Sequence, residues 1–211
     1  MDLHGLRREY TLHGLERHEL AADPVDQFRV WFKQACDADI NEPNAMVLAT
    51  VRPDGAPSSR VVLLKAFDSR GFAFYTNLRS HKARELEANP RVSATFPWLE
   101  FERQVHVVGT IEHVSREETE AYFRSRPYQS QLGAWASHQS EPVADRAALE
   151  ARFEQLKRDY PEGQVPVPPY WGGLRIKPDR IEFWQGRPSR LHDRFVYVRA
   201  SQGWAISRLQ P

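Results

Sequence analysis

The feature that most constrains the fold is a series of short apolar runs separated by turn residues. The first run covers residues 45–51, the next 60–67 and the third 72–76, and Pro53-Asp54-Gly55 separates the first two. Short β-branched and aromatic runs bounded by Gly, Pro and Asp are typical of antiparallel strands joined by tight turns. We therefore predict an antiparallel meander in the first half of the chain.

The rest of the chain adds helices and further strands. Asp23 before Pro24, Ser80 and Ser115 each stand where a helix cap is expected, and from Asp145 on, apolar residues repeat at helical spacing as far as Tyr160. Further strands are predicted at residues 92–97, 104–114, 173–176, 180–184, 195–199 and 204–209. Because strands and helices do not alternate as β-α-β units, we predict a mainly β protein with helices (α+β), closed as an antiparallel barrel.

Composition narrows the class of protein. A chain of 211 residues suits one domain, and 29 Lys and Arg against 28 Asp and Glu leave a net charge of +1, so no overall field favours nucleic acid or an anionic membrane. The N-terminus has neither a secretory signal pattern nor an apolar anchor, so we expect no membrane association. The single cysteine, Cys36, fits a reducing, cytoplasmic location, and its neighbours Trp31 and Phe32 predict a buried, inert thiol.

Two segments concentrate cations near predicted strand ends. Residues 75–82 run from a strand into a helix start and carry hydroxyls with Arg79, His81 and Lys82, which suits a phosphate at a helix N-terminus. Taken alone, this segment is better explained as a capped surface helix with solvated charges. Arg60 and Lys65 flank an apolar strand, but strict alternation points them to opposite faces unless the strand is bulged or the ligand lies at a rim.

The densest group of functional side chains lies at residues 184–194. It places Trp184, His192 and Asp193 with three arginines around a Gly-Arg-Pro turn. Arginine binds phosphate and carboxylate oxygens in pairs, and histidine changes charge near neutral pH. So many donors beside a large aromatic ring favour a binding site over a plain surface loop.

These segments, in this order, resemble the pyridoxamine 5′-phosphate oxidase family almost from end to end. The matching segments are Arg7-Arg8-Glu9-Tyr10, residues 60–65, Tyr75-Thr76-Asn77, Arg103-Gln104-Val105, Ser125-Arg126-Pro127, Gln139-Ser140, Trp171-Gly172-Gly173, residues 182–186 and residues 190–194. The resemblance implies an FMN-binding split β-barrel whose homodimer holds FMN at the subunit interface. It also implies oxidation of phosphorylated B6 vitamers to pyridoxal 5′-phosphate by O2, with release of hydrogen peroxide.

The resemblance also assigns roles to individual residues. FMN would be held by Arg60, Val61, Val62, Leu63, Leu64, Lys65, Tyr75, Thr76, His81, Lys82, Gln104, Gln139, Ser140, Trp184 and Arg194. The substrate would be bound by Arg7, Tyr10, Lys65, Tyr122, Arg126, Ser130, Arg190, Leu191 and His192, of which Arg190 and His192 would be catalytic. No metal site is expected.

Residues 1–22 are expected to form an N-terminal segment that acts as a lid. Residues 23–211 would then form a single FMN-binding split-barrel domain, with dimerisation and substrate binding in about 170–211. His81 stands where the family usually has Arg, which predicts weaker or more pH-sensitive FMN binding.

Two alternative functions share these features. Another split-barrel flavin or deazaflavin oxidoreductase would keep the phosphate contacts without the pair Arg190 and His192. A non-catalytic module that binds FMN or pyridoxal phosphate would keep Arg60, Lys65 and Lys82 without oxygen-dependent turnover.

Overall fold

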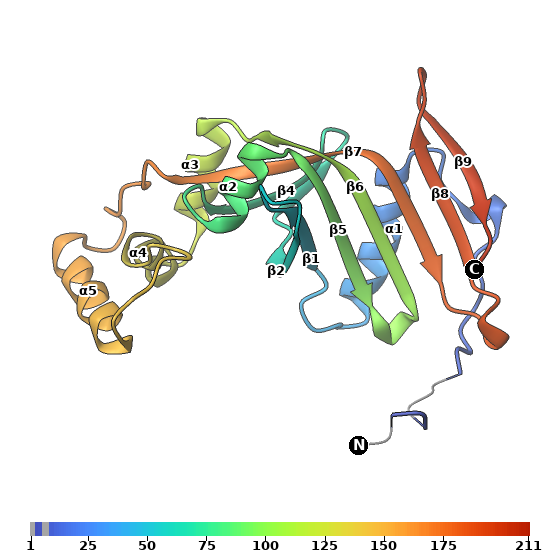
Figure 1. Cartoon of the computed structure of the whole chain (residues 1–211), viewed down its shortest axis with the longest axis horizontal. Helices are drawn as coiled ribbons and strands as arrows, with labels where there is room; N and C mark the ends of the chain where they lie inside the picture. The colour runs from blue at the N-terminus through green and yellow to red at the C-terminus, as the bar shows by residue number, and fades with distance from the viewer. Residues whose placement is uncertain (1–2, 6–8) are drawn as a thin grey trace.

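A single curled antiparallel sheet forms the body of the protein in the computed structural model, which describes residues 3–5 and 9–211 (Figure 1). Its strands are β1 (Ala45–Val51), β2 (Pro57–Leu63), β3 (Ala66–Asp68), β4 (Gly71–Asn77), β5 (Arg91–Trp98), β6 (Arg103–His113), β7 (Trp171–Gln185), β8 (Asp193–Arg199) and β9 (Trp204–Leu209). Within the described residues the order is β2-β1-β5-β6-β7-β4-β3, and β8 pairs with β7 and β9. The predicted mainly β split barrel with helices is confirmed.

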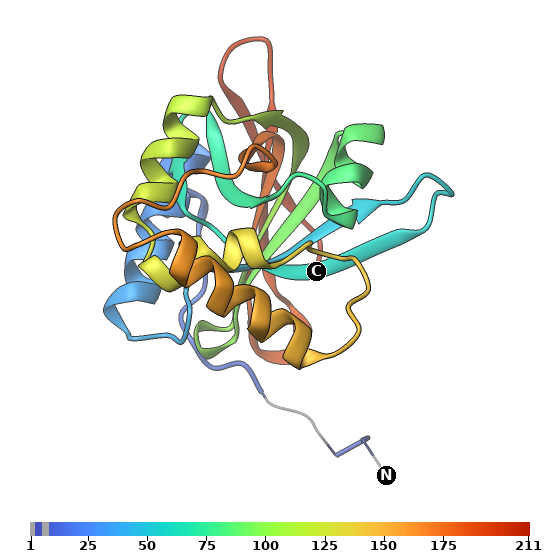
Figure 2. The same cartoon turned by 90° about the vertical axis from the view of Figure 1, so that its left-hand side faces the viewer.

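Five α-helices accompany the sheet in the described part of the chain. They are α1 (Pro24–Asp37), α2 (His81–Ala88), α3 (Arg116–Ser125), α4 (Tyr128–Ala136) and α5 (Arg146–Asp159), with short 3-10 turns η1 (Arg17–Glu19), η2 (Leu99–Phe101) and η3 (Pro188–Arg190). The caps act as predicted at α1 and α3, where the side chains of Asp23 and Ser115 accept backbone N–H groups. The predicted Ser80 cap of α2 is wrong, because the Ser80 hydroxyl accepts no backbone N–H and is instead contacted by the Lys82 ammonium. Asp145 caps α5. Helices α4 and α5 stand in front of one end of the sheet (Figure 2).

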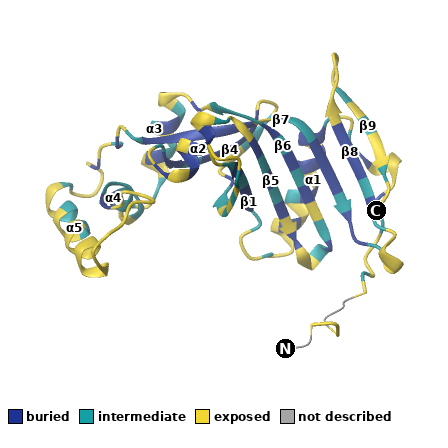
Figure 3. Ribbon diagram, viewed as in Figure 1, coloured by how far each residue is buried: buried dark blue, intermediate teal, exposed yellow. Residues whose placement is uncertain are grey.

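The core lies between α1 and the concave face of the sheet. Phe28 of α1 is fully buried and meets Phe72 and Phe96 with ring centroids 4.9 Å from its own. One turn later, Trp31 packs edge-on against Phe183 of β7. Figure 3 shows the buried residues concentrated in the central strands, whereas α5 is mostly exposed. Aromatic edge-to-face packing of this kind ties α1 to strands far apart in the sequence.

Strand β7 differs from the sequence expectation, because one strand replaces the two predicted at 173–176 and 180–184. It continues through Pro178, which has no N–H to donate, because the pairing with β6 shifts register between Val108 and Gly109. A Cβ on Gly109 would lie 1.9 Å from the carbonyl oxygen of Lys177, so only glycine allows this approach. The bulge thus keeps β7 continuous over 15 residues.

Two further expectations need correction. The run 60–67 is not one strand: β2 ends at Leu63 and β3 begins at Ala66, because the Lys65 N–H turns to the carbonyl of Ala73. Cys36 is exposed rather than buried, because it lies one helical step past the buried Ala35 on the solvent side of α1. In the described residues no helix is long and apolar enough to cross a membrane.

Replacing Gly109 tests whether the bulge holds β6 and β7 together. We expect Gly109→Ala to lower the free energy of unfolding by at least about 3 kcal/mol, because its methyl group collides with backbone rather than with a movable side chain. Gly133→Ala in α4 is the matched control: nothing lies within 4 Å of its Cβ position, so it should raise stability by about 0.5 to 1 kcal/mol. Urea denaturation of both variants measures the contrast, and equal effects would contradict this account of the bulge.

Candidate functional site

A cavity of about 1290 Å³ lies where β2, β4, α2 and the α3–α4 segment meet. It exceeds the roughly 300–1,000 Å³ of common small-molecule pockets, so two ligands can lie side by side in it. Its described lining consists of Arg52, Pro53, Ser58, Arg60, Val61, Val62, Leu63, Lys65, Tyr75, Thr76, His81, Lys82, Arg84, Glu85, Tyr122, Arg126, Pro127, Ser130, Gln139, Ser140 and Trp171.

Arg60 is held in place at this cavity by a buried carboxylate. Its guanidinium lies 3.2 Å from Glu85 of α2 and donates to the hydroxyls of Thr50 and Ser58 at 2.5 Å each. Glu85 is 7% exposed and also accepts from the Thr50 hydroxyl. Contacts from three elements fix the direction of the guanidinium, which reduces the entropy lost when it binds an anion.

Lys82 adds a second, desolvated cation one turn before Glu85. Its ammonium donates to the hydroxyls of Thr76 at 3.1 Å and Ser80 at 3.3 Å. Burial above all, and then repulsion from Arg60, lower the pKa of Lys82 to about 8, although attraction to Glu85 opposes both. A bound phosphate would supply the counter-charge that this buried ammonium lacks.

The beginning of α2 contributes polar groups around this ammonium. The backbone N–H of His81 donates to the hydroxyl of Ser140 at 3.2 Å, and the Thr76 hydroxyl donates to the side-chain oxygen of Gln139 at 3.2 Å. The segment after α4 therefore closes over the N-terminus of α2, the end of a helix that favours anions. The effect of His81 on FMN binding stays a prediction.

A stack of aromatic rings and Arg126 forms the other end of the cavity. The rings of Tyr75 and Tyr122 stack at 4.0 Å, and Trp171 lies parallel to both. The Arg126 guanidinium lies 4.8 Å from the Trp171 ring, and its Nη1 is buried without a hydrogen-bond partner in the described part of the chain. Because a buried unpaired donor is costly, Arg126 fits an anionic ligand in the cavity.

Most of the residues predicted to bind FMN or the substrate phosphate line this cavity. Arg60 and Lys65 both line it, because the strand breaks between them, and this removes the conflict of faces noted above. Leu64 does not line it: its side chain is 4% exposed in the core, and its N–H donates to the carbonyl of Asn44. The predicted residues that do line it are Arg60, Val61, Val62, Leu63, Lys65, Tyr75, Thr76, His81, Lys82, Tyr122, Arg126, Ser130, Gln139 and Ser140.

The other predicted FMN residues lie together elsewhere on the sheet. Gln104 of β6, Trp184 of β7 and Arg194 of β8 are direct partners across three adjacent strands and line a pocket of about 330 Å³. Arg194 donates to the buried Glu182 at 2.7 Å, as does Arg180 at 2.6 Å. Burial tends to raise the pKa of Glu182, but these two hydrogen bonds outweigh it and hold the pKa below its usual value.

Arg190 and His192 lie beside this second group. The His192 ring lies 4.6 Å from Trp184 and 5.5 Å from Tyr10. Its Nδ1 accepts the N–H of Arg187 at 3.1 Å, which leaves Nε2 to carry the proton of the neutral ring. Burial, then the charge of Arg190, lower the pKa of His192, while Asp193 opposes them, so the neutral form is favoured near pH 7.

The loop that carries these two side chains has an uncommon backbone. Ser189 and Arg190 both have positive φ, 56° and 64°, a conformation that costs energy for residues other than glycine. Arg190 and Leu191 are exposed there, so both can reach a ligand outside their own chain. Arg7 lies outside the described residues.

Two tryptophans, one lining each of these pockets, lie at opposite ends of β7. Trp171 at its start lines the large cavity, and Trp184 near its end lines the smaller pocket. Thirteen residues of extended chain separate them, or roughly 40 Å. Figure 1 shows β7 crossing the molecule from the α3 side to β8. Trp171 and Trp184 of one chain therefore cannot both contact one small ligand, whereas tryptophans from two chains facing each other can.

Several residues that organise the site were absent from the sequence expectation. Glu85, Glu182 and Glu102 are buried carboxylates that hold cations or backbone N–H groups near the two groups. Glu85 alone gave a usable signal, because its spacing of three from Lys82 puts both on one helical face. Among the described residues, no cluster of His, Cys, Asp and Glu is suited to a metal ion.

Family models match most of the chain. The model described as pyridoxamine 5′-phosphate oxidase matches residues 32–158, and that described as the pyridoxine 5′-phosphate oxidase C-terminal dimerisation region matches 171–211. A relative from Rubrobacter xylanophilus, named pyridoxine/pyridoxamine 5′-phosphate oxidase, is 58% identical over all of this chain and 97% of its own. A relative of the same name from Dichelobacter nodosus is 51% identical over the whole of both chains.

Solved structures agree with the fold. PhzG from Burkholderia lata, solved in complex with tetrahydrophenazine-1-carboxylic acid, has a TM-score of 0.90 at 31% identity and covers 97% of this chain and 100% of its own. A pyridoxamine 5′-phosphate oxidase-related, FMN-binding protein from Nostoc punctiforme has a TM-score of 0.74 at 18% identity, covering 91% of this chain and 100% of its own.

The burial of Lys82 should lower the free energy of unfolding of the ligand-free protein. Below pH 8 the Lys82 ammonium is charged in both the folded and the unfolded protein, and its desolvation lowers the stability of the fold. Between about pH 8 and 10.5 the folded protein loses this proton before the unfolded chain does, so the destabilisation disappears. Lys82→Met should therefore raise stability at pH 7 by about 1 to 2 kcal/mol after allowance for solvent screening, and by much less at pH 10.

Urea denaturation at the two pH values measures this difference. Lys33→Met is the matched control, because Lys33 is an exposed helical lysine paired only with the exposed Asp37. Its effect should stay within about 0.5 kcal/mol at both pH values. A Lys82→Met protein that is less stable than wild type at pH 7 would contradict a desolvated, unpaired ammonium.

Proposed function

The chain belongs to the pyridoxamine 5′-phosphate oxidase family, and from this premise we propose how its two groups of side chains share the work of the reaction. The protein oxidises pyridoxamine 5′-phosphate or pyridoxine 5′-phosphate to pyridoxal 5′-phosphate with FMN and reduces O2 to H2O2. It acts as a homodimer. We propose that each FMN lies in the large cavity of one chain and contacts Gln104, Trp184 and Arg194 of the other chain.

The observation that carries this arrangement is the separation of the two groups along β7. The donor set at each end also fits FMN. Arg60, Lys82 and the N-terminus of α2 offer charge and N–H groups to its phosphate, and the buried ammonium of Lys82 has only hydroxyl partners among the described residues. Gln104, Trp184 and Arg194 present a flat, polar-edged surface across three strands, which suits a flavin ring.

A second anion fits at the aromatic end of the cavity. We propose that Arg126, Lys65, Tyr122 and Ser130 bind the substrate phosphate, where the unpaired Nη1 of Arg126 gains its missing acceptor. Burial raises the pKa of Tyr122, so its hydroxyl stays protonated and can donate. Anchoring the phosphate far from the reacting carbon orients the pyridine ring, which is the main requirement for transfer between two stacked rings.

FMN, when bound, would supply the redox chemistry, which is acceptance of a hydride from the exocyclic carbon of the substrate and transfer of the electrons to O2. The protein supplies orientation and charge. We propose that Arg190 from the partner chain steadies negative charge at the reacting end of the substrate, and that His192 donates from Nε2 to a substrate oxygen. The strained backbone at Ser189 and Arg190 supports this, because such strain often accompanies a functional constraint.

The same reasoning extends to domain organisation and location. We propose residues 1–22 as an N-terminal lid segment and 23–211 as one FMN-binding domain, with dimerisation and substrate binding in about 170–211. Tyr10 supports the lid, since its ring contacts both Trp184 and His192. A cytoplasmic location is proposed because the single cysteine forms no disulfide within the chain.

Oxygen-dependent turnover tests the function directly. We expect the purified, FMN-loaded protein to be a yellow dimer that releases one H2O2 for each pyridoxal 5′-phosphate formed from pyridoxamine 5′-phosphate. A split-barrel reductase would bind FMN without this stoichiometry, and a carrier would bind pyridoxal 5′-phosphate without turnover. A protein that takes up no FMN at any pH would refute the proposal.

Arg190 separates catalysis from cofactor binding. We expect Arg190→Ala to lower kcat/KM by about 100-fold or more while the dissociation constant for FMN changes less than threefold, because the side chain acts on the substrate. Flavin absorbance after gel filtration measures FMN content, and peroxide release measures turnover. Arg199→Ala, in β8 away from both pockets, should change neither. Loss of FMN with normal turnover per bound flavin would contradict the assigned role.

A further inference from the structure

Glu102 is a buried carboxylate that none of the roles above uses. It follows η2 at the entrance to β6, is 2% exposed, and has φ of 53°, which is uncommon for a residue other than glycine. Its backbone carbonyl accepts the N–H of Gly186 at 2.7 Å, so it is fixed to the end of β7. An ionised side chain is expensive to bury, so this position calls for a physical reason.

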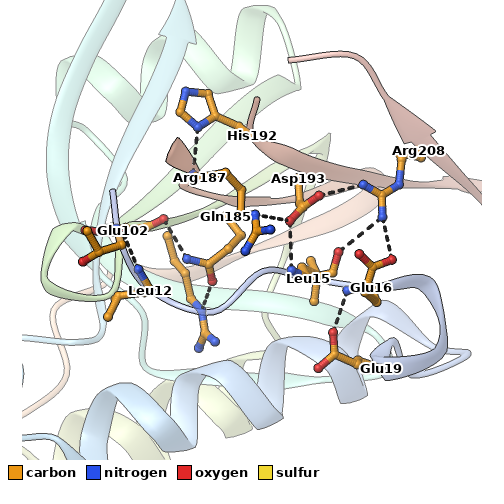
Figure 4. Close-up of polar contacts among 12 residues, drawn as sticks. Leu12, Leu15, Glu16, Glu19, Glu102, Gln185, Arg187, His192, Asp193 and Arg208 are labelled. Atoms are coloured by element: carbon orange, nitrogen blue, oxygen red, sulfur yellow. Dashed lines mark hydrogen bonds and ion pairs between the residues drawn. The ribbon is translucent and has the colours of Figure 1, made fainter. Parts of the chain in front are cut away.

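The carboxylate holds the N-terminal segment by its backbone. One oxygen, Oε2, accepts the N–H groups of both Thr11 at 3.0 Å and Leu12 at 3.2 Å (Figure 4). The other, Oε1, is buried and has no hydrogen-bond partner in the parts of the chain that the structure describes. A single oxygen therefore fixes two consecutive amides, and hydrogen bonds to a charged acceptor are among the stronger ones in proteins.

Tyr10 immediately precedes these two amides, so the anchor sets its position. Its ring lies over Gly186, where an added Cβ would stand 2.8 Å from Cγ of Tyr10 and 3.0 Å from Cβ of Glu102. The same ring meets Trp184 and His192 edge-on, with centroids 5.7 and 5.5 Å away. Glycine at position 186 thus leaves room for both Tyr10 and Glu102 to pack against the end of β7.

A second carboxylate fixes the same segment farther along. Asp193 accepts the N–H of Leu15 at 3.0 Å and is itself held by Arg208 at 2.6 Å and Arg187 at 3.4 Å (Figure 4). The segment is therefore tied down at two points. Only the Glu102 contact adjoins Tyr10, so the Asp193 contact fixes the path of the segment and the Glu102 contact fixes its end.

We propose that Glu102 is a positioning residue for the substrate: through the amides of Thr11 and Leu12 it holds Tyr10 against the Trp184–His192 face, where Tyr10 closes over the bound pyridine. This rests on the proposed function of that face. Glu102 acts through Tyr10 and touches neither FMN nor the reacting atoms. Its loss should therefore weaken substrate binding without loosening the cofactor.

Two isosteric variants test the anchor. Glu102→Met fills the same space without an acceptor, whereas Glu102→Gln keeps one oxygen able to accept both amides. We expect Glu102→Met to raise KM for pyridoxine 5′-phosphate at least tenfold with kcat within threefold, and Glu102→Gln to stay within threefold of wild type in both. The FMN dissociation constant should be unchanged in each. Equilibrium dialysis of pyridoxal 5′-phosphate against the FMN-loaded proteins should show the same ranking without turnover.

A matched control and a double variant separate positioning from general damage. Glu19→Met removes another carboxylate-to-amide contact of the same segment, to the N–H of Glu16, away from Tyr10, and should leave KM unchanged. Tyr10→Ala should raise KM by itself, and adding Glu102→Met to it should raise KM no further, because both act through one ring.

Three results would overturn the inference: unchanged KM in Glu102→Met, effects of Glu102→Met and Tyr10→Ala that multiply, or equal loss of FMN and substrate. Should Glu102→Met fail to fold, Thr11→Pro deletes one of the two amides and leaves Glu102 in place, and an unchanged KM there overturns the inference as well. Absence of peroxide release by the wild-type protein is a different result, since it would refute the proposed function rather than the anchor.

Discussion

The length and stiffness of β7 determine how this protein can build a site. A continuous strand of 15 residues, kept unbroken by the bulge at Gly109, carries Trp171 at one end and Trp184 at the other. Cations and the unpaired guanidinium of Arg126 lie near the first end, and Gln104, Trp184 and Arg194 lie side by side on three strands near the second. In the proposed function neither group alone completes the binding site. Because roughly 40 Å of extended strand separates the two tryptophans, the proposed site needs a second chain to bring them to one ligand.

Buried carboxylates set the direction of the groups that bind ligands. Glu85 fixes Arg60, Glu182 fixes Arg194, and Glu102 fixes the backbone before which Tyr10 stands. Burying these charges costs stability unless each is fully paired, and the unpaired Oε1 of Glu102 and Nη1 of Arg126 show that pairing is incomplete in the described chain. The protein thus accepts a weaker fold in exchange for cations and rings that are already oriented before a ligand arrives.

Sequence patterns predicted the strands and caps well because turn chemistry and capping are local. These patterns failed where a residue far away in the sequence determines the local structure. Two strands were predicted where β7 runs on through Pro178, because the bulge in β6 accommodates the proline. Strict alternation placed Arg60 and Lys65 on opposite faces, yet the strand ends between them. Site residues could be named only through resemblance to a family. Glu102 could not be found in that way, because its role depends on the backbone of a segment 90 residues away in sequence.

FMN and the substrate are proposed to be bound by parts of the chain that differ in local stability. In the proposed arrangement the FMN phosphate is held by β2, β4 and α2, elements fixed by sheet pairing and by the aromatic core around Phe28. Closure over the substrate is proposed instead for Tyr10 and its exposed neighbours, which are held by the hydrogen bonds of Thr11 and Leu12 to Glu102, whereas Leu15 farther along is buried in the core. A segment with few buried apolar contacts opens at low free energy, whereas the sheet does not. On the proposed function, substrate and product would therefore exchange while FMN stays bound, as repeated turnover on one flavin requires.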